Sequence, residues 1–207
     1  GKAIANYLWK NDYKKQQGYF EKDGDVIVTW AYGHILRLAT PEEYDEKYKF
    51  WKNYPIIPKK WQIKPSANTK KQLDVILQLL KKADIVINAG DPDREGQLLI
   101  DEILDYAGYK GIVQRLLLNA KDDISLKRAF ENIQDNNNFK NLYMAGLGRS
   151  RADWLVGMNL TRAYSVSARK YGYNTIFRIG RVKIPTLALV VNREKEIQNF
   201  KSPKYYE

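Results

Sequence analysis

The sequence predicts an α/β fold in which a parallel sheet is flanked by helices and followed by a mainly helical segment. Between residues 69 and 133, short runs rich in β-branched residues alternate with amphipathic stretches at helical spacing. This alternation is typical of a parallel sheet with crossover helices. Beyond residue 138 the strand-like runs stop, and a long proline-free helical pattern begins.

The first elements precede this alternation. Residues 1–10 form an amphipathic pattern that predicts a short helix, and residues 26–32 are β-branched and aromatic and predict a strand. Because an α/β domain commonly opens with a strand, we expect that a first strand precedes Gly1. The second strand ends at Gly33 and His34, where a histidine bonded into a turn is favoured over a functional one.

Residues 41–65 contain several prolines, with tryptophans and a tyrosine set among lysines. This composition opposes long helices and predicts an extended, ordered loop. Trp51 in this loop has two interpretations, a platform for a nucleic-acid base or an anchor on the core, and the anchor is slightly favoured.

The alternating elements follow in order. Apolar residues at helical spacing with lysines on the opposite face predict a packing helix over residues 69–82. The later elements are a strand at 85–89, a helix at 97–106, a strand at 112–118 and a helix at 125–133.

The turn at residues 91–96 places Asp91, Asp93 and Glu95 between a strand and a helix. In a doubly wound fold, the carboxyl end of a strand faces the ligand-binding crevice. Convergent carboxylates there suit Mg²⁺, which binds a few carboxylates together with waters and a phosphate. The turn taken by itself favours the alternative, a solvated helix start, since acidic residues are common in the first helical turn.

Composition excludes several classes of protein. The chain has 207 residues with 44% hydrophobic and 13% aromatic residues, which excludes a disordered protein, and no apolar run approaches the length of a membrane span. It has no cysteine and one histidine, which excludes disulfides and zinc sites built on these residues.

The net charge of +11 is concentrated at the end of the chain. From residue 140 onward there are 13 Lys and Arg against 4 Asp and Glu, which leaves +2 for residues 1–139. This distribution indicates a polyanionic partner such as nucleic acid.

The polar residues 135–138 mark the best domain boundary, and a helix is expected over residues 142–171. At about 100° per residue, Arg151, Arg162 and Arg169 fall within about 20° of one another and form a stripe bordered by Trp154. Such a stripe suits a single nucleic-acid strand, because guanidinium groups bind phosphates while an aromatic ring accepts a base. A core tryptophan beside solvated arginines is an equally good interpretation.

Residues 177–183 follow this helix. Gly180 allows close approach of the backbone, and the cations Arg178, Arg181 and Lys183 could hold a phosphate backbone.

Three motifs stand in order: Gly-Asp-Pro-Asp-Arg-Glu-Gly at residues 90–96, Arg-Ala-Asp-Trp-Leu-Val-Gly-Met-Asn-Leu-Thr-Arg-Ala-Tyr at 151–164 and Gly-Arg-Val at 180–182. Together they resemble the type IA DNA topoisomerases, of the topoisomerase III kind. The resemblance covers essentially the whole chain.

The resemblance implies a Toprim domain at residues 1–138, lacking its first strand and the glutamate on it, and the start of a helical domain that binds single-stranded DNA at 139–207. It implies Mg²⁺ as cofactor, with Mn²⁺ as the alternative, and places Arg94 near the reacting phosphate. It also implies a monomer in the bacterial cytoplasm at the nucleoid, with no membrane contact. The DNA contacts that it implies or allows are His34, Trp51, Arg149, Arg151, Trp154, Arg162, Arg169, Arg178, Gly180, Arg181 and Lys183.

The family's reaction is a transesterification in which a tyrosine attacks one strand and stays linked to its 5′ side while another strand passes. The family's Tyr-x-Arg-Thr motif occurs at none of the 15 tyrosines here, so the chain by itself is expected to be inactive. Lys183 and Ile184 stand where the family commonly has Gln-Thr. Two alternatives remain: another Toprim protein, such as a primase or nuclease, and a non-catalytic nucleic-acid-binding module.

Overall fold

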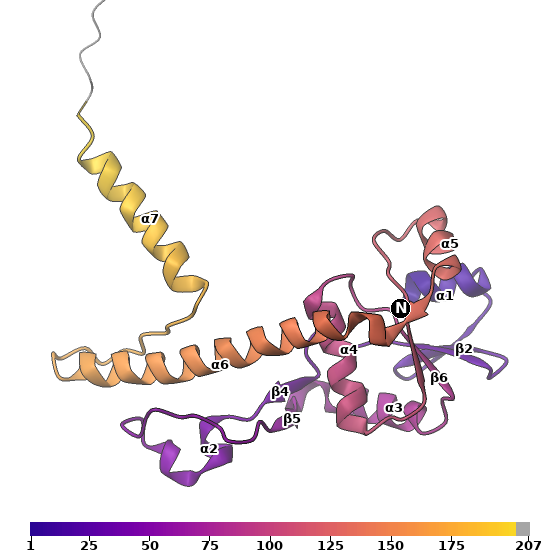
Figure 1. Cartoon of the computed structure of the whole chain (residues 1–207), viewed down its shortest axis with the longest axis horizontal. Helices are drawn as coiled ribbons and strands as arrows, with labels where there is room; N and C mark the ends of the chain where they lie inside the picture. Colours follow the sequence, from indigo (N-terminus) through magenta and orange to yellow (C-terminus); the bar gives the residue numbers. More distant parts are fainter. Residues whose placement is uncertain (202–207) are drawn as a thin grey trace, which may run out of the picture. The chain divides into compact units, whose positions relative to one another are not determined.

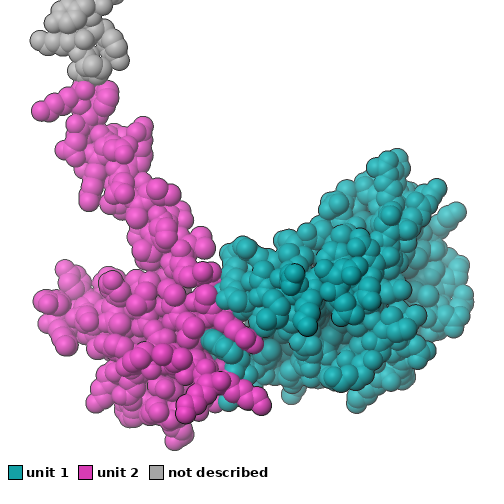
Figure 2. Space-filling view, viewed as in Figure 1, with its two compact units in different colours: residues 1–39, 61–149 teal, residues 40–60, 150–207 magenta. Residues whose placement is uncertain are grey.

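The computed structural model describes residues 1–201, so the end of the domain expected at 139–207 lies outside the described residues. The chain divides into two compact units, which Figure 2 shows in different colours. The first unit comprises residues 1–39 and 61–149, and the second comprises residues 40–60 and 150–207. The expected boundary at residue 138 therefore differs from the limits of these units and stays a prediction.

The helices lie in the order shown in Figure 1. The α-helices are α1 (Lys2–Trp9), α2 (Pro41–Tyr44), α3 (Lys70–Leu80), α4 (Arg94–Ala107), α5 (Asp123–Glu131), α6 (Lys140–Arg169) and α7 (Lys183–Gln198). Short 3₁₀ turns are η1 (Glu46–Lys49), η2 (Ala67–Thr69) and η3 (Asn136–Phe139). The predicted helices at the start of the chain and at 69–82, 97–106, 125–133 and 142–171 are thus confirmed, with small differences at their ends.

The strands form three small sheets in the described part of the chain. The strands are β1 (Lys14–Gln16), β2 (Tyr19–Lys22), β3 (Val26–Thr29), β4 (Leu36–Leu38), β5 (Ile63–Pro65), β6 (Ile85–Asn88), β7 (Ile112–Arg115) and β8 (Gln134–Asp135). The predicted parallel arrangement is confirmed for β6 and β7, which α4 connects. The other pairs, β1–β2, β2–β3, β4–β5 and β7–β8, are antiparallel.

The loop predicted over residues 41–65 is only partly extended, and that prediction was wrong for its first third. Thr40 and Glu43 form a capping box, and Pro41 occupies the first turn, so α2 begins where prolines suggested a loop. This is a position at which proline stabilises a helix, because its missing N–H has no partner there in any case.

The core of the first unit joins β4, a strand that was not predicted from the sequence, to the predicted helices α3 and α4. Ile35 and Leu36 pack with Leu73 and Ile76 of α3 and with Ile103 of α4. This packing fixes α4 from one side, so its N-terminal end, which carries the acidic turn, stands on a rigid element.

The described residues contain no helix that is both long enough and apolar enough to cross a membrane.

Candidate functional site

Residues 91–96, called the acidic turn, follow β6 and lead into α4, and they carry Asp91, Asp93 and Glu95. Asp93 is the N-cap of α4, and its Oδ1 accepts a hydrogen bond of 2.7 Å from the backbone N–H of Gly96. This capping satisfies an N–H that the helix leaves without a partner. The helix-start interpretation of the turn is therefore correct for Asp93, and it leaves the other carboxylates to be explained.

Two glycines allow the turn to fold back on the helix. A Cβ atom on Gly90 would overlap the carbonyl oxygen of Gly96, and one on Gly96 would overlap the backbone of Asp91. The nearest atoms at both positions are backbone atoms, which cannot rotate away as a flexible side chain could, so neither glycine can be replaced without moving the turn. The backbone conformation of the turn is therefore tightly defined, and this fixes the positions from which the side chains of Asp91 and Asp93 project.

Arg115, at the end of β7, stabilises the backbone of the acidic turn from its buried side. Its side chain is fully buried and donates hydrogen bonds to the carbonyl oxygens of Asn88 at 3.0 Å, Gly90 at 2.7 Å and Asp91 at 2.7 Å. Burial lowers the pKa of Arg115, and the negative charge of Asp101 opposes this effect. This role of Arg115 was not predicted from the sequence, although an arginine inside the apolar run of a strand was a usable signal.

A second set of buried polar groups lies beside Arg115. Asp101 of α4 accepts hydrogen bonds from the amides of Asn88 at 3.1 Å and Asn136 at 3.0 Å through one oxygen, and from Gln97 at 2.8 Å through the other. Asn136 belongs to the polar stretch 135–138 that was predicted as a boundary. In the structure Asp135 belongs to β8, which pairs with β7, and Asn136 bonds to Asp101 of α4.

The first part of α6 brings Arg149 to the acidic turn. Gly146 packs where a Cβ atom would lie 2.7 Å from the carbonyl oxygen of Arg94, so α6 crosses the start of α4 closely. One turn further along, Nε of Arg149 lies 3.6 Å from Oε1 of Glu95. The structure therefore brings together Asp91, Asp93, Arg94, Glu95 and Arg149 around the start of α4.

Carboxylate oxygens suit a hard cation. The predicted convergence of Asp91, Asp93 and Glu95 on one point is, however, not found. Asp91 and Asp93 are exposed, whereas Glu95 is half-buried and faces Arg149. Within residues 1–201 no group of three or more His, Cys, Asp or Glu side chains is arranged to hold a metal ion. Mg²⁺ needs only one or two carboxylates when waters and a phosphate complete its shell, so the donor set remains compatible with it.

The second unit contains the whole of the predicted arginine stripe, but part of the stripe is buried. Arg162 is 4% exposed, and its guanidinium lies 2.7 Å from Glu42 and 2.6 Å from the carbonyl oxygen of Tyr48. The guanidinium groups of Arg162 and Arg169 also lie over the ring of Trp51, at 5.6 and 5.8 Å from its centre. Trp51 is thus already in contact with two cations, as in a cation–π pair.

The sequence left the orientation of Trp154 open between the core and a DNA surface. Trp154 is buried, and the edge of its ring meets the ring of Tyr44 with the centres 5.7 Å apart. The structure thus favours packing for this residue. Arg151, on the preceding turn of α6, is half-buried.

The segment that follows α6 is tied back to this helix (Figure 1). The backbone N–H of Ile179 donates to Oγ1 of Thr161 at 3.0 Å, and Arg181 pairs with Asp153 at 2.6 Å. Arg178 and Lys183 are exposed, and Gly180 accepts a backbone bond from Ile184 at 3.1 Å at the start of α7. His34 lies exposed in the first unit, away from this segment in the sequence.

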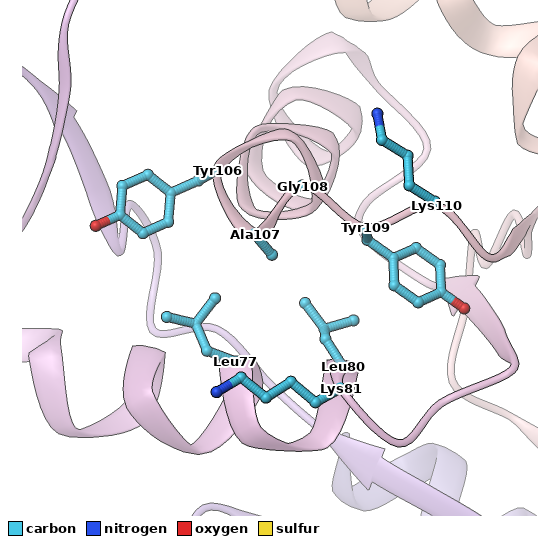
Figure 3. Close-up of a pocket in the computed structure, with 8 residues that line it drawn as sticks. All are labelled: Leu77, Leu80, Lys81, Tyr106, Ala107, Gly108, Tyr109 and Lys110. Carbon is cyan, nitrogen blue, oxygen red and sulfur yellow. The ribbon is translucent and has the colours of Figure 1, made fainter.

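A shallow cavity of about 450 Å³ lies at the C-terminal ends of α3 and α4 (Figure 3). Leu77 and Leu80 form its floor, while Tyr106 and Tyr109 stand at opposite sides of it. The acidic turn is at the other end of α4, and the cavity contains none of the predicted site residues. We therefore assign no part of the site to it.

Comparison with known proteins agrees with this geometry. Residues 1–128 match the Toprim domain family, and residues 137–207 match a DNA topoisomerase family. The chain belongs to the type IA DNA topoisomerases. The acidic turn and Arg115 lie in the Toprim match, and the arginine stripe lies in the topoisomerase match.

Several bacterial proteins named DNA topoisomerase 3 are similar to the chain along its whole length. It is 45% identical to DNA topoisomerase 3 of Vibrio cholerae over 99% of this chain and 32% of that protein. It is 43% identical to DNA topoisomerase 3 of Salmonella typhimurium over 100% of this chain and 33% of that protein. The chain thus spans about a third of the length of these relatives.

A solved structure shares the fold of this type IA region. Full-length topoisomerase I from Thermotoga maritima matches with a TM-score of 0.62 at 23% identity, over 99% of this chain and 31% of that one. At this level of identity the match supports the fold, while the roles of individual residues depend on the geometry described above.

Proposed function

We propose that this chain forms the acidic centre and part of the DNA-binding surface of a topoisomerase that cleaves, passes and reseals single DNA strands through a 5′-phosphotyrosine link. The observation that carries the proposal is the pair of family matches in tandem, with an acidic turn in the first and a basic helix in the second. No Tyr-x-Arg-Thr motif occurs in the sequence, so the attacking tyrosine belongs to another part of the enzyme.

In this proposal, Asp91, Asp93 and Glu95 form the seat of Mg²⁺, for which Mn²⁺ can substitute. When bound, the ion supplies positive charge beside the phosphate that reacts. Asp93 uses one oxygen to cap α4, which orients its carboxylate.

The two arginines beside the turn would stabilise the negative charge that develops on the reacting phosphate. Arg94 is exposed on the first turn of α4, and Arg149 reaches the same place from α6. Glu95 holds Arg149 in this position, and the pair is open enough for a DNA phosphate to become the partner of Arg149.

For the DNA-binding surface of the second unit we propose the exposed cations Arg169, Arg178, Arg181 and Lys183, and we propose His34, exposed in the first unit, as a separate DNA contact. The less exposed residues would act by shaping this surface. Arg162 and Trp154 are buried in an ion pair and a ring contact, and Trp51, Arg151 and Gly180 are half-buried. The domains at 1–138 and 139–207, single-stranded DNA as partner and the monomeric state are part of the same proposal.

The alternatives predict different behaviour. A primase or nuclease of the Toprim type does not account for the topoisomerase match at residues 137–207. A non-catalytic DNA-binding module would keep the carboxylates as structure and would bind no cation through them.

Manganese binding tests the acidic centre. Electron paramagnetic resonance of Mn²⁺ in the presence of the chain and a short single-stranded oligonucleotide should show bound ion, and Asp91→Asn with Asp93→Asn should weaken that binding at least about tenfold. Asparagine is also a good N-cap, so the turn should remain folded. Asp74→Asn, on the exposed face of α3, is the matched control. Equal binding by all three proteins would contradict the proposed metal seat.

A further inference from the structure

The turn after α6 displays three aromatic rings that no function described so far uses. Tyr171 is 80% exposed, Tyr173 is 60% exposed and Phe177 is 37% exposed. Burial of tyrosine rings normally stabilises a protein, so a cluster left in water is a candidate for binding.

The turn has a defined conformation. The N–H of Tyr171 donates to Ala168 at 3.0 Å, and the N–H of Tyr173 donates to the same carbonyl at 3.2 Å. Gly172 lies between them with φ +85°, a conformation that other residues rarely adopt. Downstream, the N–H of Phe177 donates to Oγ of Ser165 at 2.9 Å, which ties the segment back to α6.

Two of the three rings, those of Tyr173 and Phe177, also contact each other. The ring of Phe177 meets that of Tyr173 edge to face, with the centres 6.3 Å apart and the planes at 85°. Phe177 therefore supports Tyr173 from one side and leaves the rest of its ring to solvent. Rings fixed in this way lose little conformational freedom when a ligand binds.

The charge around the rings selects the kind of ligand. Between residues 154 and 193 the sequence has seven Lys and Arg and no Asp or Glu. Arg169 and Lys170 directly precede Tyr171, and both are exposed. Aromatic rings among cations suit a strand of nucleic acid with unpaired bases, since the cations neutralise phosphates while bases stack on the rings.

We infer that Tyr171 and Tyr173 form a stacking site for the unpaired bases of single-stranded DNA. The inference deepens the proposed function, because it names two residues that would distinguish a single strand from a duplex. In a duplex the bases are already stacked on one another, so the rings would gain nothing from it.

Abasic DNA provides the test. Fluorescence anisotropy of the whole chain is measured with an oligothymidylate and with an abasic oligonucleotide of the same length and charge. Tyr171→Ala and Tyr173→Ala should each weaken binding to oligothymidylate about tenfold and leave binding to the abasic strand unchanged. Tyr171→Phe and Tyr173→Phe should bind as the unmodified chain does, because they keep the ring. Tyr106→Ala, in the first unit, is the control, and circular dichroism checks that every variant is folded.

The outcomes are distinct. If the unmodified chain binds neither oligonucleotide, both this inference and the proposed function are wrong. If it binds both, and the alanine variants lose affinity for neither or for both equally, the stacking site alone is wrong. Stronger binding to vesicles of phosphatidylglycerol than to oligothymidylate would also overturn the inferred stacking site, since the rings would then bind a membrane surface.

Discussion

At the scale of single residues, the position of the acidic carboxylates depends on a buried cation. Arg115 donates to the backbone carbonyl oxygens of Asn88, Gly90 and Asp91, so a large part of the support for the turn comes from backbone contacts rather than from the acidic side chains. Asp91 and Asp93 are therefore exposed on a backbone that is fixed from the buried side.

Replacing Arg115 should therefore be costly. Arg115→Met fills a similar volume but removes the guanidinium hydrogen bonds to the carbonyl oxygens of Asn88, Gly90 and Asp91, which should lower the free energy of unfolding by roughly 2–4 kcal/mol. Urea denaturation measures this change. Arg128→Met, at an exposed position on α5, should change it by less than about 0.5 kcal/mol. Equal effects of the two substitutions would contradict the role given to Arg115.

Tyr143 should make the chain sensitive to alkaline pH. Burial and then the 2.6 Å hydrogen bond to Asp105 raise the pKa of Tyr143. The neutral hydroxyl is thus favoured in the folded chain, and the resulting stability is complete below the unfolded pKa of about 10 and falls as the pH rises beyond it. Thermal unfolding of the unmodified chain and of Tyr143→Phe should show a difference that shrinks between pH 9 and pH 11. A constant difference would exclude this linkage.

At the scale of elements, the close crossing of α4 and α6 places Arg149 beside Glu95. The crossing depends on the absence of a side chain at Gly146, which meets the carbonyl of Arg94 and the side chain of Leu98. Gly148 lies on the same helix and has open space around its Cα atom. These two glycines therefore form a natural pair for comparison.

Alanine should have opposite effects at the two positions. Gly146→Ala should destabilise the chain by about 1–3 kcal/mol, because the helices must move apart. Gly148→Ala should stabilise it by up to about 1 kcal/mol, because alanine is the better helix former. Chemical denaturation of both variants tests the crossing, and stabilisation by both would show that α6 does not pack on α4 as described.

The elements with strong periodicity were predictable from the sequence, and those that depend on distant partners were not. The helix α3 and the strand β6 follow directly from their apolar patterns. Burial of Arg162 could not be predicted, because the partner elements α2 and η1 lie about 120 residues earlier and were expected to be a loop. Helical spacing predicted that Arg162 and Arg169 share a face of α6, which agrees with their common contact with Trp51, but it could not predict the ion pair that buries Arg162.

At the scale of the whole molecule, the acidic turn and the excess of positive charge lie in different parts of the chain. The acidic turn lies in the nearly neutral first two-thirds, and the excess of cations lies after residue 140. The sequence motifs predicted this division and the family. The support behind the turn, made of Arg115, Asp101 and Asn136, emerged only when the strands and helices were placed in space.

The cationic surface should make DNA binding depend strongly on salt. If about four phosphates of a single strand are neutralised, affinity should fall roughly 50-fold between 50 and 200 mM salt. Anisotropy titrations with oligothymidylate measure this slope. Equal affinity at both salt concentrations would show that the net charge of +11 does not drive binding.

The attacking tyrosine should be absent from this chain. After incubation with a single-stranded oligonucleotide and Mg²⁺, followed by denaturation, no covalent protein–DNA adduct should appear on a gel. A trapped adduct on the 207-residue chain would show that one of its 15 tyrosines is the nucleophile.

We propose that the turn at Asp91 and Asp93 is the acidic centre of strand cleavage and religation. Relaxation of negatively supercoiled DNA in Mg²⁺ is measured for a topoisomerase that contains this chain, with and without Asp91→Asn combined with Asp93→Asn. We predict that the unmodified enzyme relaxes the DNA and that the double variant is at least about 100-fold slower while it binds single-stranded DNA equally well. Relaxation at an unchanged rate by the double variant would contradict the account.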